Sequence, residues 1–194
     1  GDAQQAQTYL RQAREAGVPD TMIMYETAAL EMMQGDLDRA RIIAQQLAET
    51  DPSNAEAHVI LCLVQMQKYS SAKTKEERNA IADEMNNPVA AIEKIKGDKD
   101  FQTLFIKGRA NMVVLDYDAA RENMREALKV APPPGVLTVL DSILRLDLMK
   151  GDMESAGADA KTMLQRDPNN SFANYVMGSI ALRDRNTESA EAFM

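Results

Sequence analysis

Helix-length segments of alternating apolar and polar residues recur along this chain, and the turns that end them recur at a fixed distance. Three pairs of turn landmarks stand 17 residues apart, namely Gly35 and Pro52, Leu115 and Pro132, and Gly151 and Pro168. The text around them is nearly the same each time: QGDLDRARIIAQQLAETDPSN, VLDYDAARENMREALKVAPPP and KGDMESAGADAKTMLQRDPNN. A fourth copy, RDRNTESAEAFM, begins at Arg183. The pattern predicts a series of similar helix pairs separated by short turns.

This pattern resembles the tetratricopeptide repeat, a helix-turn-helix unit of about 34 residues, and the resemblance covers nearly the whole chain. It implies an all-α fold, a right-handed α-solenoid of about ten or eleven helices without strands. The periodic apolar face of one repeat cannot be buried within that repeat, so successive repeats must stack.

We expect a single repeat array over residues 1–194. Its parts are a half repeat at 1–18, full repeats at 21–54, 55–100, 101–136 and 137–170, and a truncated repeat at 171–194. The family pattern requires a small residue where two helices cross. The positions that meet this requirement are Ala28, Ala40, Cys62, Gly108, Gly178 and Ala190, whereas Leu144 departs from it. Because the array starts with a lone second helix and stops inside another, we expect a segment of a longer protein.

The second repeat is about 12 residues longer than the others. Thr74 and Glu77 have the spacing of a capping box and predict a helix over 75–86. Pro88 then predicts the first turn of a separate short helix over 88–96, because a proline inside a helix costs about 3 kcal/mol. We therefore expect the second helix of this repeat to be broken at Pro88.

Composition narrows the classes of function. Apolar residues make up 45% of the 194 residues, which indicates a folded chain, and the net charge of −8 repels phosphate backbones. We therefore expect no nucleic-acid partner. No apolar run approaches the roughly 18 residues of a membrane span, so we expect no membrane insertion in this segment. The location stays open: cytoplasmic, or periplasmic or envelope if a signal peptide was removed upstream.

The residue types that carry chemistry are scarce. His58 is the sole histidine and Cys62 the sole cysteine, four residues apart on one predicted helix face. Zinc normally needs at least three protein ligands, and no nearby histidine or cysteine supplies the rest. Packing between helices explains both residues better, so we expect no catalytic residue, no metal and no cofactor. The chain is predicted not to be an enzyme.

The resemblance also implies where a partner binds. In the family, the first helix of each repeat lines a concave groove, at the second, fifth, ninth, twelfth and thirteenth repeat positions. The candidate groove residues are Met22, Tyr25, Met32, Met33, Val59, Leu63, Met66, Phe105, Arg109, Met112, Asp141, Arg145, Phe172, Tyr175 and Arg183. Some family members hold a terminal carboxylate with Lys and Asn in the first repeat. Tyr25 and Ala29 stand at those places here, so that carboxylate clamp is not expected.

The two halves of this predicted groove differ. Its N-terminal part is rich in methionine, a flexible side chain that accommodates varied apolar partners. Its C-terminal part carries arginines suited to carboxylates. Two alternatives remain open. The methionines can instead be buried against neighbouring helices, and Arg145 can pair with Asp141, four residues earlier on the same helix face.

These observations predict a protein-interaction scaffold whose partner is a protein or peptide held in the groove. The alternative is a structural or assembly spacer within a larger repeat protein. Such a spacer would make its contacts through its end faces, with self-association through exposed end helices.

Overall fold

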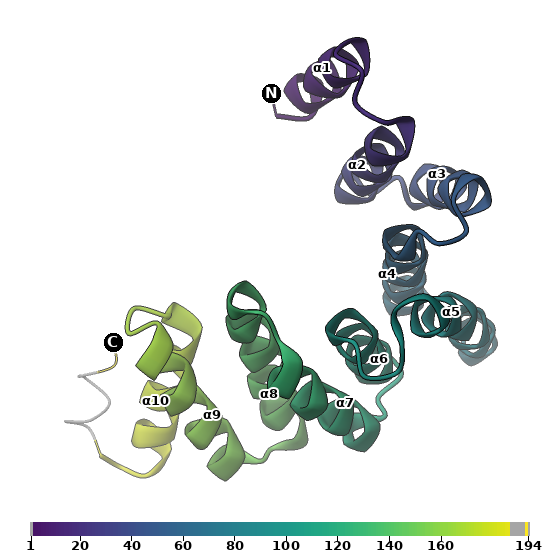
Figure 1. Ribbon diagram of the computed structural model, residues 1–194. Coiled ribbons are helices and arrows are strands. Elements are labelled where there is room, and N and C mark those ends of the chain that lie inside the picture. Colours follow the sequence, from purple (N-terminus) through teal and green to yellow (C-terminus); the bar gives the residue numbers. More distant parts are fainter. Residues whose placement is uncertain (1, 187–192, 194) are drawn as a thin grey trace. The chain divides into compact units, whose positions relative to one another are not determined.

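The computed structural model describes residues 2–186 and residue 193, and within the first helix it describes side chains from Gln4 onward. These residues form ten α-helices and one short 3-10 helix, and they contain no strand (Figure 1). The helices are α1 (Asp2–Glu15), α2 (Asp20–Met33), α3 (Leu37–Thr50), α4 (Ala55–Ser71), α5 (Lys75–Lys96), α6 (Phe101–Val113), α7 (Tyr117–Val130), η1 (Pro133–Gly135), α8 (Val136–Lys150), α9 (Met153–Arg166) and α10 (Ser171–Arg183). The predicted all-α architecture of helix pairs is confirmed. The helix expected after α10, with Ala190 at its crossing, lies outside the described residues.

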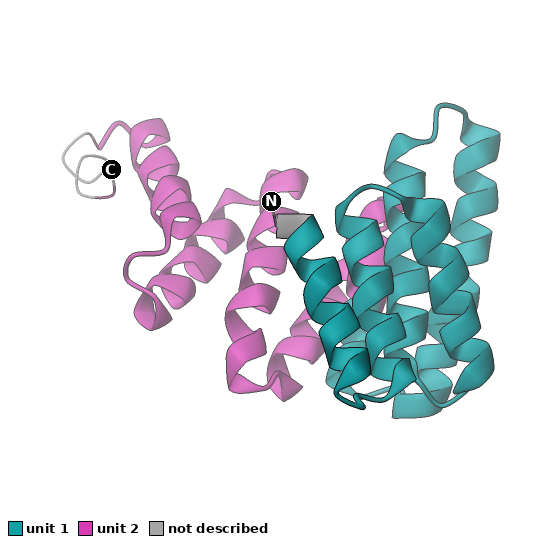
Figure 2. Cartoon of the chain, turned by 90° about the horizontal axis from the view of Figure 1, so that it is seen from above, with its two compact units in different colours: residues 1–106 teal, residues 107–194 magenta. Residues whose placement is uncertain are grey.

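The chain divides into two compact units, shown in different colours in Figure 2, and each is described by itself. The N-terminal unit, Gly1–Ile106, holds α1 to α5 and the start of α6. In it each helix packs on the next one from α1 to α5, and α2 also contacts α4. The C-terminal unit, Lys107–Met194, holds the rest of α6 and the helices α7 to α10, of which α8 packs on both α7 and α9. In both units, therefore, a helix is buried by its neighbours along the chain.

Side-chain caps fix where the helices begin. The carboxylates of Asp36, Asp116 and Asp152 each accept a hydrogen bond from the backbone N–H three residues later, at the starts of α3, α7 and α9. Such caps satisfy N–H groups that have no partner within the helix. The capping box predicted at Thr74 and Glu77 is confirmed at the start of α5.

Residues with positive φ end the first helix of several pairs. Gly35 has φ 85° and Gly151 has φ 74°. Leu115 occupies the equivalent turn with φ 65°, a left-handed conformation that side chains with a Cβ seldom adopt. The turn therefore keeps its left-handed conformation even where a leucine stands in place of the glycine.

Small residues at the helix crossings let the backbones approach closely. Ala28, Ala40 and Cys62 have no exposed surface in the N-terminal unit. At Gly108 of the C-terminal unit an added Cβ would lie 2.9 Å from Cγ of Met124, too close for an unstrained contact. Leu144 breaks the small-residue pattern, yet it is completely buried in a cluster that includes Ala156 and Ala160.

The expected break at Pro88 is wrong. Helix α5 runs without interruption from Lys75 to Lys96, with Pro88 inside it. Met85, Pro88 and Ile92 are buried on one face of α5, which packs on α4. Burying this apolar face, at about 25 cal/mol per Å², outweighs the roughly 3 kcal/mol that an internal proline costs. The extra residues of the second repeat therefore lengthen its two helices to 17 and 22 residues, instead of adding a helix.

Candidate functional site

In the N-terminal unit, the candidate groove residues differ in how accessible they are. Met22 and Met33 are exposed, and Met33 retains 83% of its surface. Met66 is only 5% exposed and belongs to the core. The half-buried members are Tyr25, Met32, Val59, Leu63 and Phe105. Of the methionines, Met22 and Met33 are thus the ones that present much apolar surface to a partner.

Helices α1 and α2 enclose an apolar pocket of about 680 Å³ beside Met33. Its walls include Tyr9, Leu10, Ala29 and Leu30, and the Tyr9 ring is 60% exposed. An exposed aromatic beside an exposed methionine is unusual for a surface that meets only water. The groove prediction omitted α1, because the family pattern assigns groove positions only to first helices. The signal that was available is Tyr9, an aromatic residue beside the apolar positions of α1.

In the C-terminal unit, three candidate residues come together around Arg145. Its guanidinium donates to both oxygens of Asp141, with Nε–Oδ2 2.7 Å and Nη2–Oδ1 3.2 Å. The same group lies over the ring of Phe172 on α10, with Cζ 4.3 Å from the ring centre. The hydrogen bonds to Asp141 raise the pKa of Arg145 above its ordinary value. The alternative left open by the sequence, an ion pair between Asp141 and Arg145, is therefore present.

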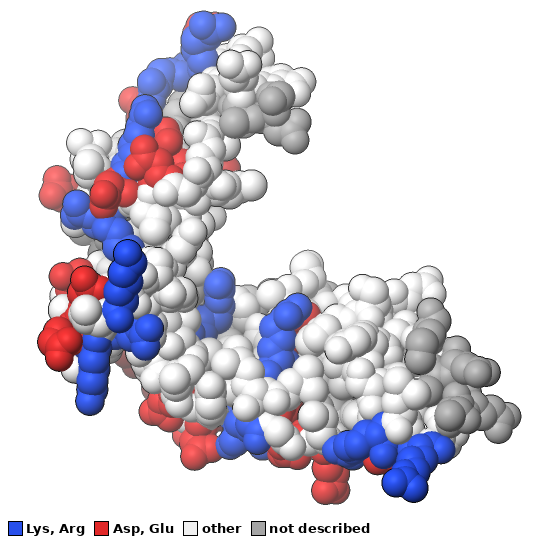
Figure 3. All heavy atoms as spheres, turned by 180° about the vertical axis from the view of Figure 1, so that it is seen from behind, with Lys and Arg blue, Asp and Glu red and all other residues white. Residues whose placement is uncertain are grey.

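The other candidates of this unit are less constrained. Tyr175 is 68% exposed on α10, and Arg183 is held by Asp184 with Nε–Oδ1 3.2 Å. Arg109 is exposed and Met112 is half-buried, both on α6. In the view of Figure 3, acidic and basic side chains lie close together along one edge of each unit, while much of the remaining face is uncharged.

A buried ionic network that the sequence did not predict crosses α7, α8 and α9. The Arg121 guanidinium lies 3.2 Å from an oxygen of the fully buried Asp147 and 3.3 Å from one of Asp152. One turn further along α7, Arg125 donates to both oxygens of Asp159, at 2.9 and 2.5 Å. The arginines bridge consecutive helix pairs, so the network holds neighbouring repeats of this unit together.

The network makes stability depend on pH through Asp147. The pKa of Asp147 is raised to about 6, mainly by burial and also by the neighbouring carboxyl of Asp159, whereas Arg121 and Arg125 act to lower it. Because this value lies above the ordinary 3.8, the folded protein binds the proton more tightly than the unfolded chain does. The stabilisation that protonation provides is complete below the ordinary pKa, and it is lost as pH rises through about 6.

We therefore expect Asp147→Asn to gain stability relative to the wild type as pH rises from about 5 to about 7. Chemical unfolding at several pH values measures this difference in free energy. Asp118→Asn is the control, because Asp118 is exposed and the hydrogen bond from Lys150 lowers its pKa. If the difference in unfolding free energy between Asp147→Asn and the wild type stays constant over this pH interval, Asp147 is ionised throughout it.

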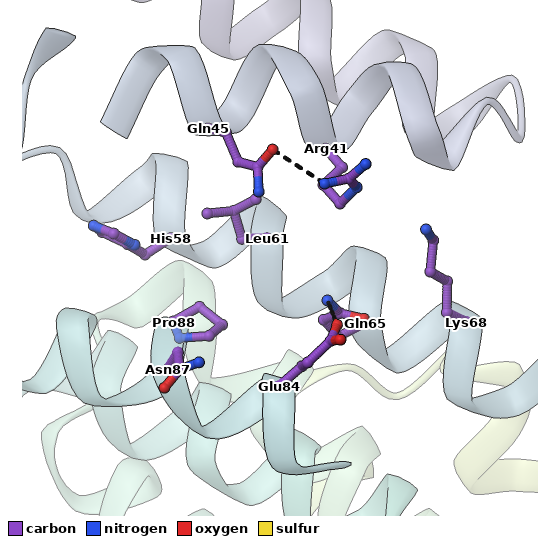
Figure 4. Close-up of a pocket in the computed structure, with 9 residues that line it drawn as sticks. All are labelled: Arg41, Gln45, His58, Leu61, Gln65, Lys68, Glu84, Asn87 and Pro88. Atoms are coloured by element: carbon purple, nitrogen blue, oxygen red, sulfur yellow. Dashed lines mark hydrogen bonds between the residues drawn. The ribbon is translucent and has the colours of Figure 1, made fainter. Parts of the chain in front are cut away.

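A second pocket, polar and about 640 Å³ in volume, lies among α3, α4 and α5 (Figure 4). Arg41 Nη1 donates to Gln45 Oε1 at 3.2 Å, and Gln65 Nε2 donates to Glu84 Oε2 at 2.8 Å. Half-buried His58 also lines the pocket, and burial lowers its pKa. The groove prediction missed this pocket because most of its residues lie outside the five inward-facing positions of the repeat.

Two features bear on chemistry and on membranes. Within the part of the chain that the structure describes, no three His, Cys, Asp or Glu side chains lie together in a way that could hold a metal ion. Cys62 is buried at a helix crossing, one turn along α4 from His58. Among residues 2–186, no helix has both the length and the apolar character that crossing a bilayer requires.

Comparison with known proteins agrees with this geometry. Residues 1–55 match a family described as tetratricopeptide repeat. A thermophilic TPR protein of Thermus thermophilus is similar in structure, with TM-score 0.75, 16% identity and coverage of 94% of this chain and 87% of that one. PilF of Pseudomonas aeruginosa has TM-score 0.72 and 16% identity, over 95% of this chain and 74% of that one.

A third structure, YrrB, is described as a TPR protein with an unusual peptide-binding site. It has TM-score 0.56 and 16% identity, over 95% of this chain and 88% of that one. No curated protein matches the chain by sequence. At these identities the likeness concerns the fold.

Proposed function

We propose that this chain, a tetratricopeptide-repeat protein, acts as a scaffold that holds a peptide segment of a partner protein along its first helices. The observation that carries the proposal is the apolar pocket between α1 and α2, whose rim residues Tyr9 and Met33 are 60% and 83% exposed. Burying such side chains against a partner releases about 25 cal/mol per Å² of apolar surface. A water-exposed pocket of this composition is typical of a binding surface.

The C-terminal unit carries exposed arginines that we propose as a separate place of contact with a partner. Arg109 is exposed on α6, and Arg145 is fixed in orientation by Asp141 and Phe172. A guanidinium held in this way retains donors that point to solvent, since its side chain is 55% exposed. We propose that Arg109 and Arg145 receive an acidic part of a partner.

The test uses peptides selected for binding to the wild-type chain from a displayed random library. Met33→Glu is expected to weaken the selected peptides at least about tenfold, because a carboxylate replaces apolar contact area. Ile42→Glu is the matched control, since Ile42 is also an exposed apolar residue but lies on the second helix α3. If the peptides bind Met33→Glu like the wild type and lose affinity for Ile42→Glu, the groove is not the site.

The arginines are tested with acidic peptides selected from the same kind of library. Arg109→Ala and Arg145→Ala should each cost about 2 kcal/mol of binding if the contact is desolvated. If no peptide can be selected and the sedimentation coefficient of the chain rises with protein concentration, the result would instead support the assembly role through the end faces.

A further inference from the structure

We propose that the polar pocket among α3, α4 and α5 is a second binding site, which receives an Asp or Glu residue of a partner peptide at Arg41. This site is separate from the groove, and the inference does not depend on the function proposed for the groove. It follows from comparing equivalent places in the two units of the chain.

In the C-terminal unit, four residues define the reference arrangement. Lys150 Nζ lies 2.6 Å from Asp118 Oδ1 and so joins α8 to α7. Arg121 follows Asp118 by three residues, and Asp147 precedes Lys150 by three. Arg121 and Asp147 face each other, with Nη2–Oδ1 3.2 Å. The carboxylate that Arg121 meets is thus supplied by the next helix of the chain itself.

The N-terminal unit repeats this register but lacks the carboxylate. Lys68 Nζ lies 2.7 Å from Asp38 Oδ1 and joins α4 to α3 in the same way. Arg41 follows Asp38 by three residues, and the residue three before Lys68 is Gln65. A neutral amide therefore stands opposite Arg41, where the C-terminal unit places Asp147.

The second carboxylate of the network is also missing in the N-terminal unit. On the buried face of α5, the residues Met85, Pro88 and Ile92 follow one another at intervals of three and four. On the buried face of α9, the residues Ala156, Asp159 and Met163 have the same intervals. Pro88 thus stands where α9 places Asp159. The arginine that pairs with Asp159 is absent as well. Arg125 follows Arg121 by four residues, and the residue four after Arg41 is Gln45.

In this pocket, Arg41 and Gln65 keep hydrogen-bonding groups that the described residues do not use. The guanidinium of Arg41 has five N–H donors, and its hydrogen bond in the described structure goes to Gln45 Oε1. Gln65 Oε1 is buried without a hydrogen-bond partner, which is an unfavourable state for a polar atom. Figure 4 shows these side chains around the open space beside Pro88.

A single acidic residue in a peptide offers an acceptor for Arg41 and a donor for Gln65 Oε1. Its carboxylate accepts from Arg41 in the two-point geometry that guanidinium favours. Its backbone N–H can donate to Gln65 Oε1, which a free carboxylate cannot do. Glu84 also lines the pocket, where its Oε2 accepts from Gln65 Nε2 at 2.8 Å.

His58 provides a reporter for the test. It is the sole histidine of the chain and lines the pocket, so its ring resonances need no separate assignment. We would titrate the full chain with N-acetyl-glutamate methylamide while recording the His58 ring and the Arg41 Nε–Hε resonances. A carboxylate bound nearby should shift both resonances and raise the pKa of His58.

Matched ligands and variants decide the outcome. The neutral N-acetyl-glutamine methylamide should produce no such shift, and Arg41→Gln should weaken the response to the glutamate compound at least about tenfold. Arg166→Gln, at an exposed arginine of α9, should respond like the wild type. An unchanged response in Arg41→Gln, or equal shifts with both compounds, would overturn the proposal. Equal responses to acetate and to the glutamate compound would show that the backbone amide is not recognised, and would overturn the assignment to a peptide residue.

Discussion

Arg125→Ala is expected to lower the free energy of unfolding of the C-terminal unit by about 3 kcal/mol or more. Asp159 is 5% exposed and receives two hydrogen bonds from Arg125. Removing the arginine leaves a buried carboxylate without its counter-charge, and this is more harmful than losing an exposed ion pair. Urea unfolding, followed by helix content, measures the change.

Two further variants isolate the cause. Lys129→Ala on the same helix removes an exposed pair with Glu126, and we expect it to change stability by less than about 1 kcal/mol. The double variant Arg125→Met with Asp159→Leu removes both charges, so it should recover most of the loss. If Arg125→Ala is no more harmful than Lys129→Ala, then water screens the pair and the network does not hold the repeats together.

The sequence predicts local structure well where one residue type has a strong backbone preference. The aspartates before α3, α7 and α9 and the glycines at positions 35 and 151 place the turns, because caps and positive φ are decided within a few residues. Periodic small residues likewise predict the helix crossings. The aspartate cap and the positive-φ turn recur in three of the repeats, so each supports the others.

Features that depend on contacts between repeats were not predictable in the same way. Pro88 looks like a helix start in its own segment, and only the packing of α5 on α4 shows that the helix continues. The pairing of Arg125 with Asp159 joins residues 34 apart, and neither residue departs from an ordinary surface pattern. The repeat pattern predicts which way the side chain of Met66 faces. Its burial depends on the side chains that surround it, which the pattern does not give.

Leu144→Ala is expected to lower the free energy of unfolding by about 3 kcal/mol, although alanine is what the repeat pattern favours at this position. Leu144 has no exposed surface and packs with Leu140, Ala156 and Ala160. Truncating it removes buried methyl groups and leaves a cavity, unless α8 and α9 move together. The reference is Cys62→Ala at the equivalent position of α4, where we expect a change below about 1 kcal/mol because one small side chain replaces another.

Denaturant titration of both variants against the wild type gives the comparison. A large loss for Leu144→Ala beside a small one for Cys62→Ala would show that the C-terminal unit has adapted its packing to a large residue at the crossing. Equal, small changes would show that α8 and α9 close over the shorter side chain, as the other helix pairs do around Ala28 and Gly108. The comparison therefore tests whether a position that departs from the repeat pattern is compensated by its neighbours or merely tolerated.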